Sequence, residues 1–125
     1  MNKLFWIKIV ALSGLLSVVI GAFTAHMLDS LLTVQRMETL DTAVQYQIFH
    51  TLALLGLIGI DDKLLAIRWK KYAAGFFLLG MVLFCGSLYV LIATSISQFA
   101  IITPLGGLSF MMGWIMLLLA AIREK

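Results

Sequence analysis

The sequence is poor in charge, in proline and in cysteine. Only 12% of its 125 residues are charged and 62% are hydrophobic. This excludes an ordinary water-soluble domain, because too few polar side chains remain to cover the surface of a chain this size. The single cysteine, Cys85, excludes a disulfide framework or a cysteine-based metal cluster within one chain. We therefore expect lipid to surround most of the chain.

A nucleic-acid partner is not predicted, although the formal charge is +3 and the pI is near 9.3. Nucleic-acid binding domains gather their basic residues on one face or along one helix, often with aromatic residues between them. The nine Lys and Arg residues of this chain are dispersed instead. Their positions relative to the apolar runs carry information about topology.

Four long apolar runs predict an all-α, four-transmembrane-helix bundle, as a single domain over residues 1–125, with helices at about 4–26, 34–60, 72–94 and 103–122. A helix of about 20 apolar residues crosses the hydrocarbon layer of a bilayer. The first run, preceded by Lys3, also resembles a secretory signal, but it is longer than a typical signal core. Residues 64–71 are expected to form a short connection.

Between the first two runs, residues 27–41 carry leucines at intervals of three and four among charged residues. This spacing predicts an amphipathic segment at the membrane interface. Thr33 is a suitable N-cap for a helix that starts at Val34. Before the last run, Pro104 suits the first turn of a helix, with Thr103 as its cap.

The basic residues predict the orientation. Only Arg36 lies in the first loop, and the third loop has no basic residue. The other eight flank the remaining ends of the runs: Lys3, Lys8, Lys63, Arg68, Lys70, Lys71, Arg123 and Lys125. Because basic residues are concentrated in cytoplasmic loops, both termini and the middle loop are expected in the cytoplasm of a multi-pass protein.

Small residues predict where helices pack. Ser13, Ser17, Gly21 and Ala25 follow one another at four-residue steps along the first run, and three further positions, Gly86, Gly106 and Gly113, lie in the last two runs. Such stripes let neighbouring backbones approach closely in a membrane. They either close the bundle or form an interface with a second copy or another protein.

The second run carries the polar residues that could take part in chemistry. Tyr46, Gln47 and His50 lie on one side of a helix at three- and four-residue spacing. A histidine inside a membrane is either part of a hydrogen-bonded clasp or a group that relays protons or binds metal. A haem held by His26 and His50 is disfavoured, because the two would differ in depth by about 12 Å. No cofactor, metal site or catalytic motif is expected.

Several segments together resemble one known family. They are Gly-Ala-Phe-Thr-Ala-His at residues 21–26, Tyr-Gln-Ile-Phe-His at 46–50, Gly-Ser-Leu-Tyr at 86–89 and Thr-Pro-Leu-Gly-Gly at 103–107. The chain is similar over nearly its whole length to the YgdD/YwdK family of small bacterial inner-membrane proteins, a domain-of-unknown-function family with a mitochondrial transmembrane relative. The resemblance implies a four-helix protein of the bacterial inner membrane. It also marks seven polar positions: His26, Tyr46, Gln47, His50, Ser87, Tyr89 and Thr103. Thr24 and Gln45 depart from the family pattern, in which glycine and often arginine occur.

These observations favour a non-enzymatic structural or accessory component of the membrane. In this hypothesis a polar cluster of His26, Tyr46, Gln47, His50 and Ser87 stabilises the bundle, and the partners are membrane lipid and a homo-oligomer or larger membrane complex. A small oligomeric transporter or proton-linked conduit that uses His50 is the alternative. An enzyme acting on lipid or quinone beside His26 and Asp29 is a third hypothesis, and the lack of a nucleophile and metal set counts against it.

Overall fold

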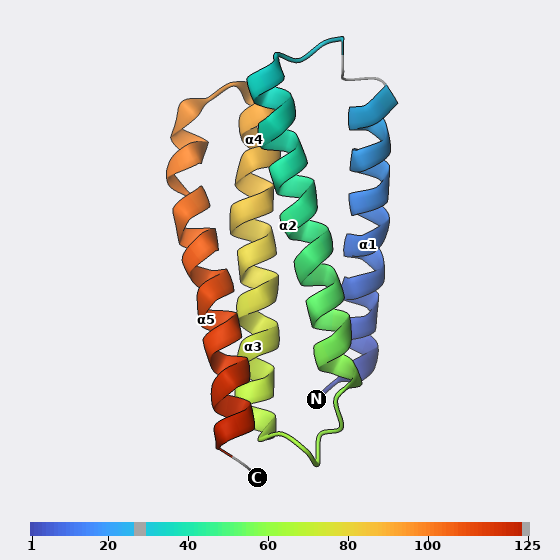
Figure 1. The fold of residues 1–125 in the computed structure, drawn as a ribbon, viewed down its shortest axis with the longest axis vertical. Helices are drawn as coiled ribbons and strands as arrows, with labels where there is room; N and C mark the ends of the chain where they lie inside the picture. Colours follow the sequence, from blue (N-terminus) through green and yellow to red (C-terminus); the bar gives the residue numbers. More distant parts are fainter. Residues whose placement is uncertain (27–29, 124–125) are drawn as a thin grey trace.

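Four long helical rods lie side by side in the computed structural model, which describes residues 1–26 and 30–123 (Figure 1). The first two rods are α1 (Lys3–His26) and α2 (Val34–Gly59). The third consists of α3 (Ile67–Gly80), the π-helical turn η1 (Met81–Cys85) and α4 (Gly86–Thr94). A 3-10 turn, η2 (Ser97–Ile101), leads into the fourth, α5 (Thr103–Ile122). The expected all-α fold is confirmed.

Within the described residues, three helical stretches are long and apolar enough to cross a membrane: Lys3–His26, Ile67–Thr94 and Ser97–Ile122. The rod α2 is long enough but more polar, since its first half carries Arg36, Glu38 and Asp41. It is also well enclosed, because it packs against α1, α3, η1 and α4. Its polar residues Gln47 and His50 are accordingly buried.

The start of α2 follows the predicted capping pattern. Thr33 has extended backbone, and its hydroxyl accepts a hydrogen bond from the Arg36 amide at 3.2 Å. The expected interfacial segment falls partly on residues 27–29, which lie outside the described residues. From Val34 onward the chain is already α2, so residues 34–41 form the first turns of that helix.

The third rod begins at Ile67, earlier than the predicted residue 72. The reason is Lys70, whose side chain is fully buried. Its ammonium donates hydrogen bonds to the Ile60 carbonyl and, at 2.6 Å, to Asp62 Oδ1. A buried charge is tolerated when it is paired in this way, and the helix therefore continues through residues that had been expected to form a connection.

The closest helix packing lies between the third rod and α5. A Cβ added at Gly106 would lie 2.6 Å from the Cα of Phe84, in the π turn. A Cβ at Gly80 would lie 2.6 Å from Cε1 of the Phe110 ring, and one at Gly113 would lie 2.5 Å from Cδ1 of the Phe77 ring. Glycine at these three positions is what lets α5 lie so close to α3 and η1.

The predicted small-residue stripe of α1 packs less closely. Ser17 is buried, Ser13 and Gly21 are partly buried, and Ala25 is exposed. A Cβ at Gly21 would lie 3.8 Å from Val44 of α2, which is ordinary van der Waals contact. Gly86, another predicted packing position, has no atom within 4 Å of such a Cβ. Neither is therefore a position of close helix packing, because Ala25 is exposed and a Cβ at Gly86 would meet open space.

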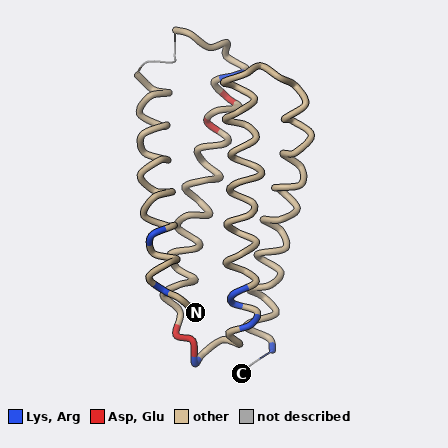
Figure 2. The backbone as a smooth tube through the Cα atoms, turned by 180° about the vertical axis from the view of Figure 1, so that it is seen from behind, with Lys and Arg blue, Asp and Glu red and all other residues tan. Residues whose placement is uncertain are grey.

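Charged residues are concentrated at one end of the bundle, where both ends of the chain also lie (Figures 1 and 2). Arg36 lies in the first turn of α2, with Glu38 and Asp41 shortly after it, and Figure 2 shows few charged residues at that end of the bundle. The described part of the chain thus has one strongly basic end and one end with few charges.

Candidate functional site

The structure distributes the predicted polar residues over three separate contacts between helices and leaves the side chains of His26 and Tyr46 exposed. The single cluster expected from the sequence is therefore wrong as an arrangement. His26 ends α1 and is exposed, because the stripe of α1 that faces α2 stops at Thr24. Gln47, His50 and Ser87 are each buried against a different set of neighbours.

Gln47 of α2 forms the first contact and joins three helices. Its amide nitrogen donates to the carbonyl oxygen of Ser13 at 3.1 Å and to the Ser13 hydroxyl at 3.2 Å, both in α1. Its amide oxygen accepts a hydrogen bond from the hydroxyl of Tyr89, in α4. Next to it, the hydroxyls of Ser13 and Thr51 lie 2.7 Å apart. Every polar atom of the Gln47 side chain is therefore in use within the protein.

His50 forms the second contact, between α2 and α5. The indole nitrogen of Trp114 donates to His50 Nε2 at 3.1 Å, and His50 Nδ1 lies 2.9 Å from the carbonyl oxygen of Tyr46. Since an indole N–H can only donate, Nε2 must be the acceptor and Nδ1 carries the proton. The neutral ring stacks on Phe110, with centroids 3.7 Å apart and planes inclined by 11°. Geometry thus fixes one tautomer of a neutral imidazole.

The third contact lies between α4 and α5. The Ser87 and Thr103 hydroxyls are 2.6 Å apart, and Ser87 also donates to the Phe84 carbonyl at 2.9 Å. Thr103 was expected to cap α5. That expectation is wrong, because Ile102 is the cap residue, without a side-chain bond, and the Thr103 hydroxyl is committed to Ser87.

Sequence reasoning missed the partners of these residues. Trp114 and Thr51 had no predicted polar role, and Ser13 was singled out only as a small packing residue. Trp114 lies 64 positions from His50 in the chain, so no local spacing links the two. The burial of Lys70 was also missed, because a lysine beside another basic residue is typical of a solvated end.

A polar contact at the basic end joins the chain start to the turn after α2. The ammonium of Met1 lies 3.7 Å from Asp62 Oδ2, and the ammonium of Lys70 lies 2.6 Å from Asp62 Oδ1. The hydrogen bond from Lys70, more than any other influence, lowers the pKa of Asp62 below its usual value of 3.8. The carboxylate is therefore held in its charged form.

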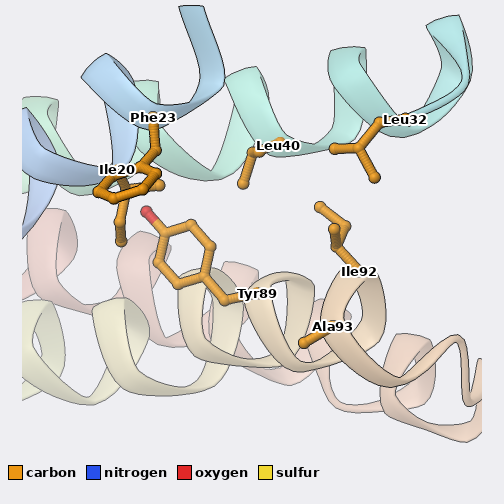
Figure 3. Close-up of a pocket in the computed structure, with 7 residues that line it drawn as sticks. All are labelled: Ile20, Phe23, Leu32, Leu40, Tyr89, Ile92 and Ala93. Carbon is orange, nitrogen blue, oxygen red and sulfur yellow. The ribbon is translucent and has the colours of Figure 1, made fainter. Parts of the chain in front are cut away.

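Among the cavities that open between the rods, two are of interest here. One of about 400 Å³ lies between α1, α2 and α4, where Tyr89 reaches toward Ile20 and Phe23 and Leu40 lies on the α2 side (Figure 3). The other, of about 580 Å³, lies between α2 and α5 and is lined by Gln45, Tyr46, His50 and several aromatic rings. The first is almost wholly apolar, whereas the second has polar groups on its wall.

Within residues 1–26 and 30–123, no group of three or more His, Cys, Asp and Glu side chains is placed to hold a metal ion. Metal sites in proteins are built from clusters of such ligands. The arrangement of the described residues instead favours hydrogen bonding between helices.

Comparison with known proteins gives a consistent result. Residues 20–107 match the family model DUF423, described as a protein of unknown function. The chain is 41% identical over 125 residues to the UPF0382 inner membrane protein YgdD of Escherichia coli, covering 100% of this chain and 95% of that protein. It is 41% identical over 113 residues to the UPF0382 membrane protein YwdK of Bacillus subtilis, covering 90% and 92%. A UPF0382 membrane protein of Haemophilus influenzae is 38% identical over 123 residues. No solved structure matches the chain.

Proposed function

Since the chain belongs to the DUF423 family, whose relatives are membrane proteins of unknown function, we propose that it is a four-span, non-enzymatic accessory protein of the bacterial inner membrane. Both termini lie in the cytoplasm in this proposal. The protein acts by presenting a stable helical surface to a partner within the bilayer.

Four spans are proposed because α2 can cross lipid while its two buried polar side chains, Gln47 and His50, stay inside the protein. Three stretches have the length and apolar character of spans, and the buried Gln47 and His50 of α2 have hydrogen-bond partners on other helices. A polar group inside a bilayer must be satisfied within the protein. The basic end of the bundle (Figure 2) fits the cytoplasmic side under the positive-inside rule.

Reporter fusions test this topology. Alkaline phosphatase fused after residue 125 is expected to be inactive and green fluorescent protein at the same place to be fluorescent. A phosphatase inserted after Ile96, between α4 and α5, is expected to be active. Phosphatase activity at the C-terminus would contradict the proposed orientation.

One observation carries the non-enzymatic role: the buried polar side chains of the described residues have their hydrogen-bond partners within the protein. Every buried side-chain nitrogen and oxygen among them has a hydrogen-bond partner. Catalytic groups, by contrast, must be available to a substrate. The polar residues of this chain are placed to hold helices together.

The surface offered to a partner is α1. Of its 24 residues only Val10, Ser17 and Thr24 are buried, and it packs mainly on α2. The rest of its length presents apolar side chains, including Leu12, Leu15 and Val18. In lipid, such a face is available to a second copy or to a helix of another protein.

Native mass spectrometry of the full chain, released from membranes in a mild detergent, tests the accessory role. A homo-oligomer or a complex with another membrane protein is expected. As a matched pair, Leu15→Trp on the exposed face of α1 should weaken the assembly, whereas Leu118→Trp on the exposed face of α5 should leave it intact. A lone monomer with no bound protein would contradict the proposal.

The proton-linked conduit that uses His50 is the second candidate. In its favour, His50 is buried and borders the 580 Å³ cavity. Against it, both ring nitrogens already have partners, and protonation of Nε2 would break the bond from Trp114. Proton flux into proteoliposomes that falls at least tenfold in His50→Ala would favour this candidate over the accessory role.

A further inference from the structure

The cavity between α2 and α5 has flat aromatic walls. The rings of Tyr46, Phe84, Phe110 and Trp114 line it together with the imidazole of His50. The Tyr46 and Phe84 rings are 4.6 Å apart between centroids. Its volume of about 580 Å³ lies within the range of small-molecule sites in proteins. Because aromatic rings pair favourably with other rings in offset-stacked or edge-to-face geometry, these walls favour a planar ligand.

The backbone beside the cavity departs from a regular α-helix. Phe84 belongs to η1, the π-helical turn in the third rod, and such turns occur frequently at functional sites. The turn brings the backbone of Phe84 against Gly106, and Gly107 next to it faces the Phe84 ring with only a hydrogen in place of a side chain. The space of the cavity therefore depends on Gly107 and on the position of Phe84.

Two polar side chains on the wall have no partner within the protein. Gln45 and Tyr46 line the cavity, yet no hydrogen bond among residues 1–26 and 30–123 uses the Gln45 amide or the Tyr46 hydroxyl. Tyr46 lies about 18 Å along α2 from Val34 at the helical rise of about 1.5 Å per residue. At that depth lipid supplies no acceptor, so an unpaired donor is costly. A ligand with carbonyl oxygens would remove that cost.

We propose that this cavity binds a membrane-soluble quinone, a flat ring with two carbonyl oxygens on an apolar chain. The ring stacks against the aromatic wall, and the carbonyl oxygens accept hydrogen bonds from the Tyr46 hydroxyl and the Gln45 amide. An acyl chain has neither a flat ring nor an acceptor in its length and leaves both donors unpaired. The proposal concerns binding alone, without a redox step, and it rests on the proposed four-span bundle because that bundle opens the cavity to the hydrocarbon layer.

Tryptophan fluorescence measures this binding directly, because Trp114 lines the cavity and the other two tryptophans, Trp6 and Trp69, lie near the starts of α1 and α3. The full chain is placed in phospholipid nanodiscs and titrated with decylubiquinone. In a variant that retains only Trp114 (Trp6→Phe, Trp69→Phe), quenching is expected to saturate. In a variant that retains only Trp69 (Trp6→Phe, Trp114→Phe), quenching by quinone dissolved in the lipid is expected to stay linear.

Two substitutions locate the site. Gly107→Leu fills the cavity, and its Cβ would lie at an ordinary 4.0 Å from the Phe84 ring, so the fold is expected to be kept while saturable quenching is lost. Gly75→Leu is the matched control, since no atom lies within 4 Å of a Cβ there, and it should bind as the native chain does. Tyr46→Phe should weaken binding about 5-fold through the loss of one hydrogen bond.

Linear quenching of both single-tryptophan variants would overturn the proposal, and so would saturable binding that survives in Gly107→Leu. Saturated palmitate that displaces the quinone at equal concentration would assign the cavity to an acyl chain and overturn it too. Circular dichroism of each variant verifies that it is folded. None of these results depends on the oligomeric state or the reporter fusions, so a failure here is distinguishable from a failure of the proposed function.

Discussion

The contact between α1 and α2 and the contact between the third rod and α5 are joined in different ways. In the first, hydrogen bonds among Ser13, Gln47 and Thr51 connect the helices, and a Cβ at Gly21 has ordinary room. In the second, glycines bring a backbone or a ring within 2.6 Å of where a Cβ would be. A small residue in a membrane helix therefore marks a close approach only where the neighbour lies against it.

The largest difference in stability between the two contacts is expected when their glycines are replaced by alanine. Gly106→Ala would force its methyl group into the backbone of Phe84, and we expect it to lower the free energy of unfolding by about 3 kcal/mol. The measurement is SDS-induced unfolding in mixed micelles, followed by circular dichroism.

The matched controls are Gly21→Ala in the first contact and Gly86→Ala, where the Cβ meets open space. Each should leave stability unchanged or raise it by up to about 1 kcal/mol, since alanine is favoured over glycine within a helix. If Gly21→Ala were as damaging as Gly106→Ala, the contrast between the two contacts would be lost.

A smaller effect is expected at the hydrogen-bonded contact. Gln47→Leu removes the bonds to Ser13 and Tyr89 and should lower the free energy of unfolding by about 1 to 2 kcal/mol. In the same assay, Gln35→Leu, in the first turn of the same helix and exposed, should change stability by less than about 0.5 kcal/mol. Equal effects at both positions would show that the bonds to α1 and α4 contribute little.

The smallest effect is expected from acid, at the contact that links α1 to the turn after α2. Because the pKa of Asp62 is lowered in the folded chain, its stabilising contribution is complete above its usual pKa of 3.8 and is lost as the pH falls through the lower folded value. Melting temperatures between pH 7 and pH 2 should therefore fall less in Asp62→Asn than in the native chain. A melting temperature that falls as far in Asp62→Asn as in the native chain would contradict this contribution.

Features that depend on neighbours along the chain could be predicted from the sequence. Long apolar runs predicted where the rods lie, and Thr33 was identified as the residue that caps α2. The start of the third rod was misjudged, because the burial of Lys70 depends on Ile60 and Asp62, which fold back to meet it. A charge that is paired in the folded chain looks identical in the sequence to one that is solvated.

The candidate residues were identified better than their arrangement. His50 and Gln47 were singled out as neighbours on one helix. Their side chains nevertheless point toward different helices, since His50 bonds to α5 and Gln47 bonds to α1. Gly86 and Gly106 look equivalent in sequence, but only Gly106 meets another backbone. Such distinctions depend on the distance between helices, which no residue spacing within one helix records.

The position of both chain ends at one end of the bundle (Figure 1) has a practical consequence. In the proposed four-span topology, two copies can be encoded as a single tandem polypeptide, because a short hydrophilic tether between them would not have to cross the bilayer. Both units keep the same orientation, so stoichiometry can be set genetically and a defective unit paired with an intact one.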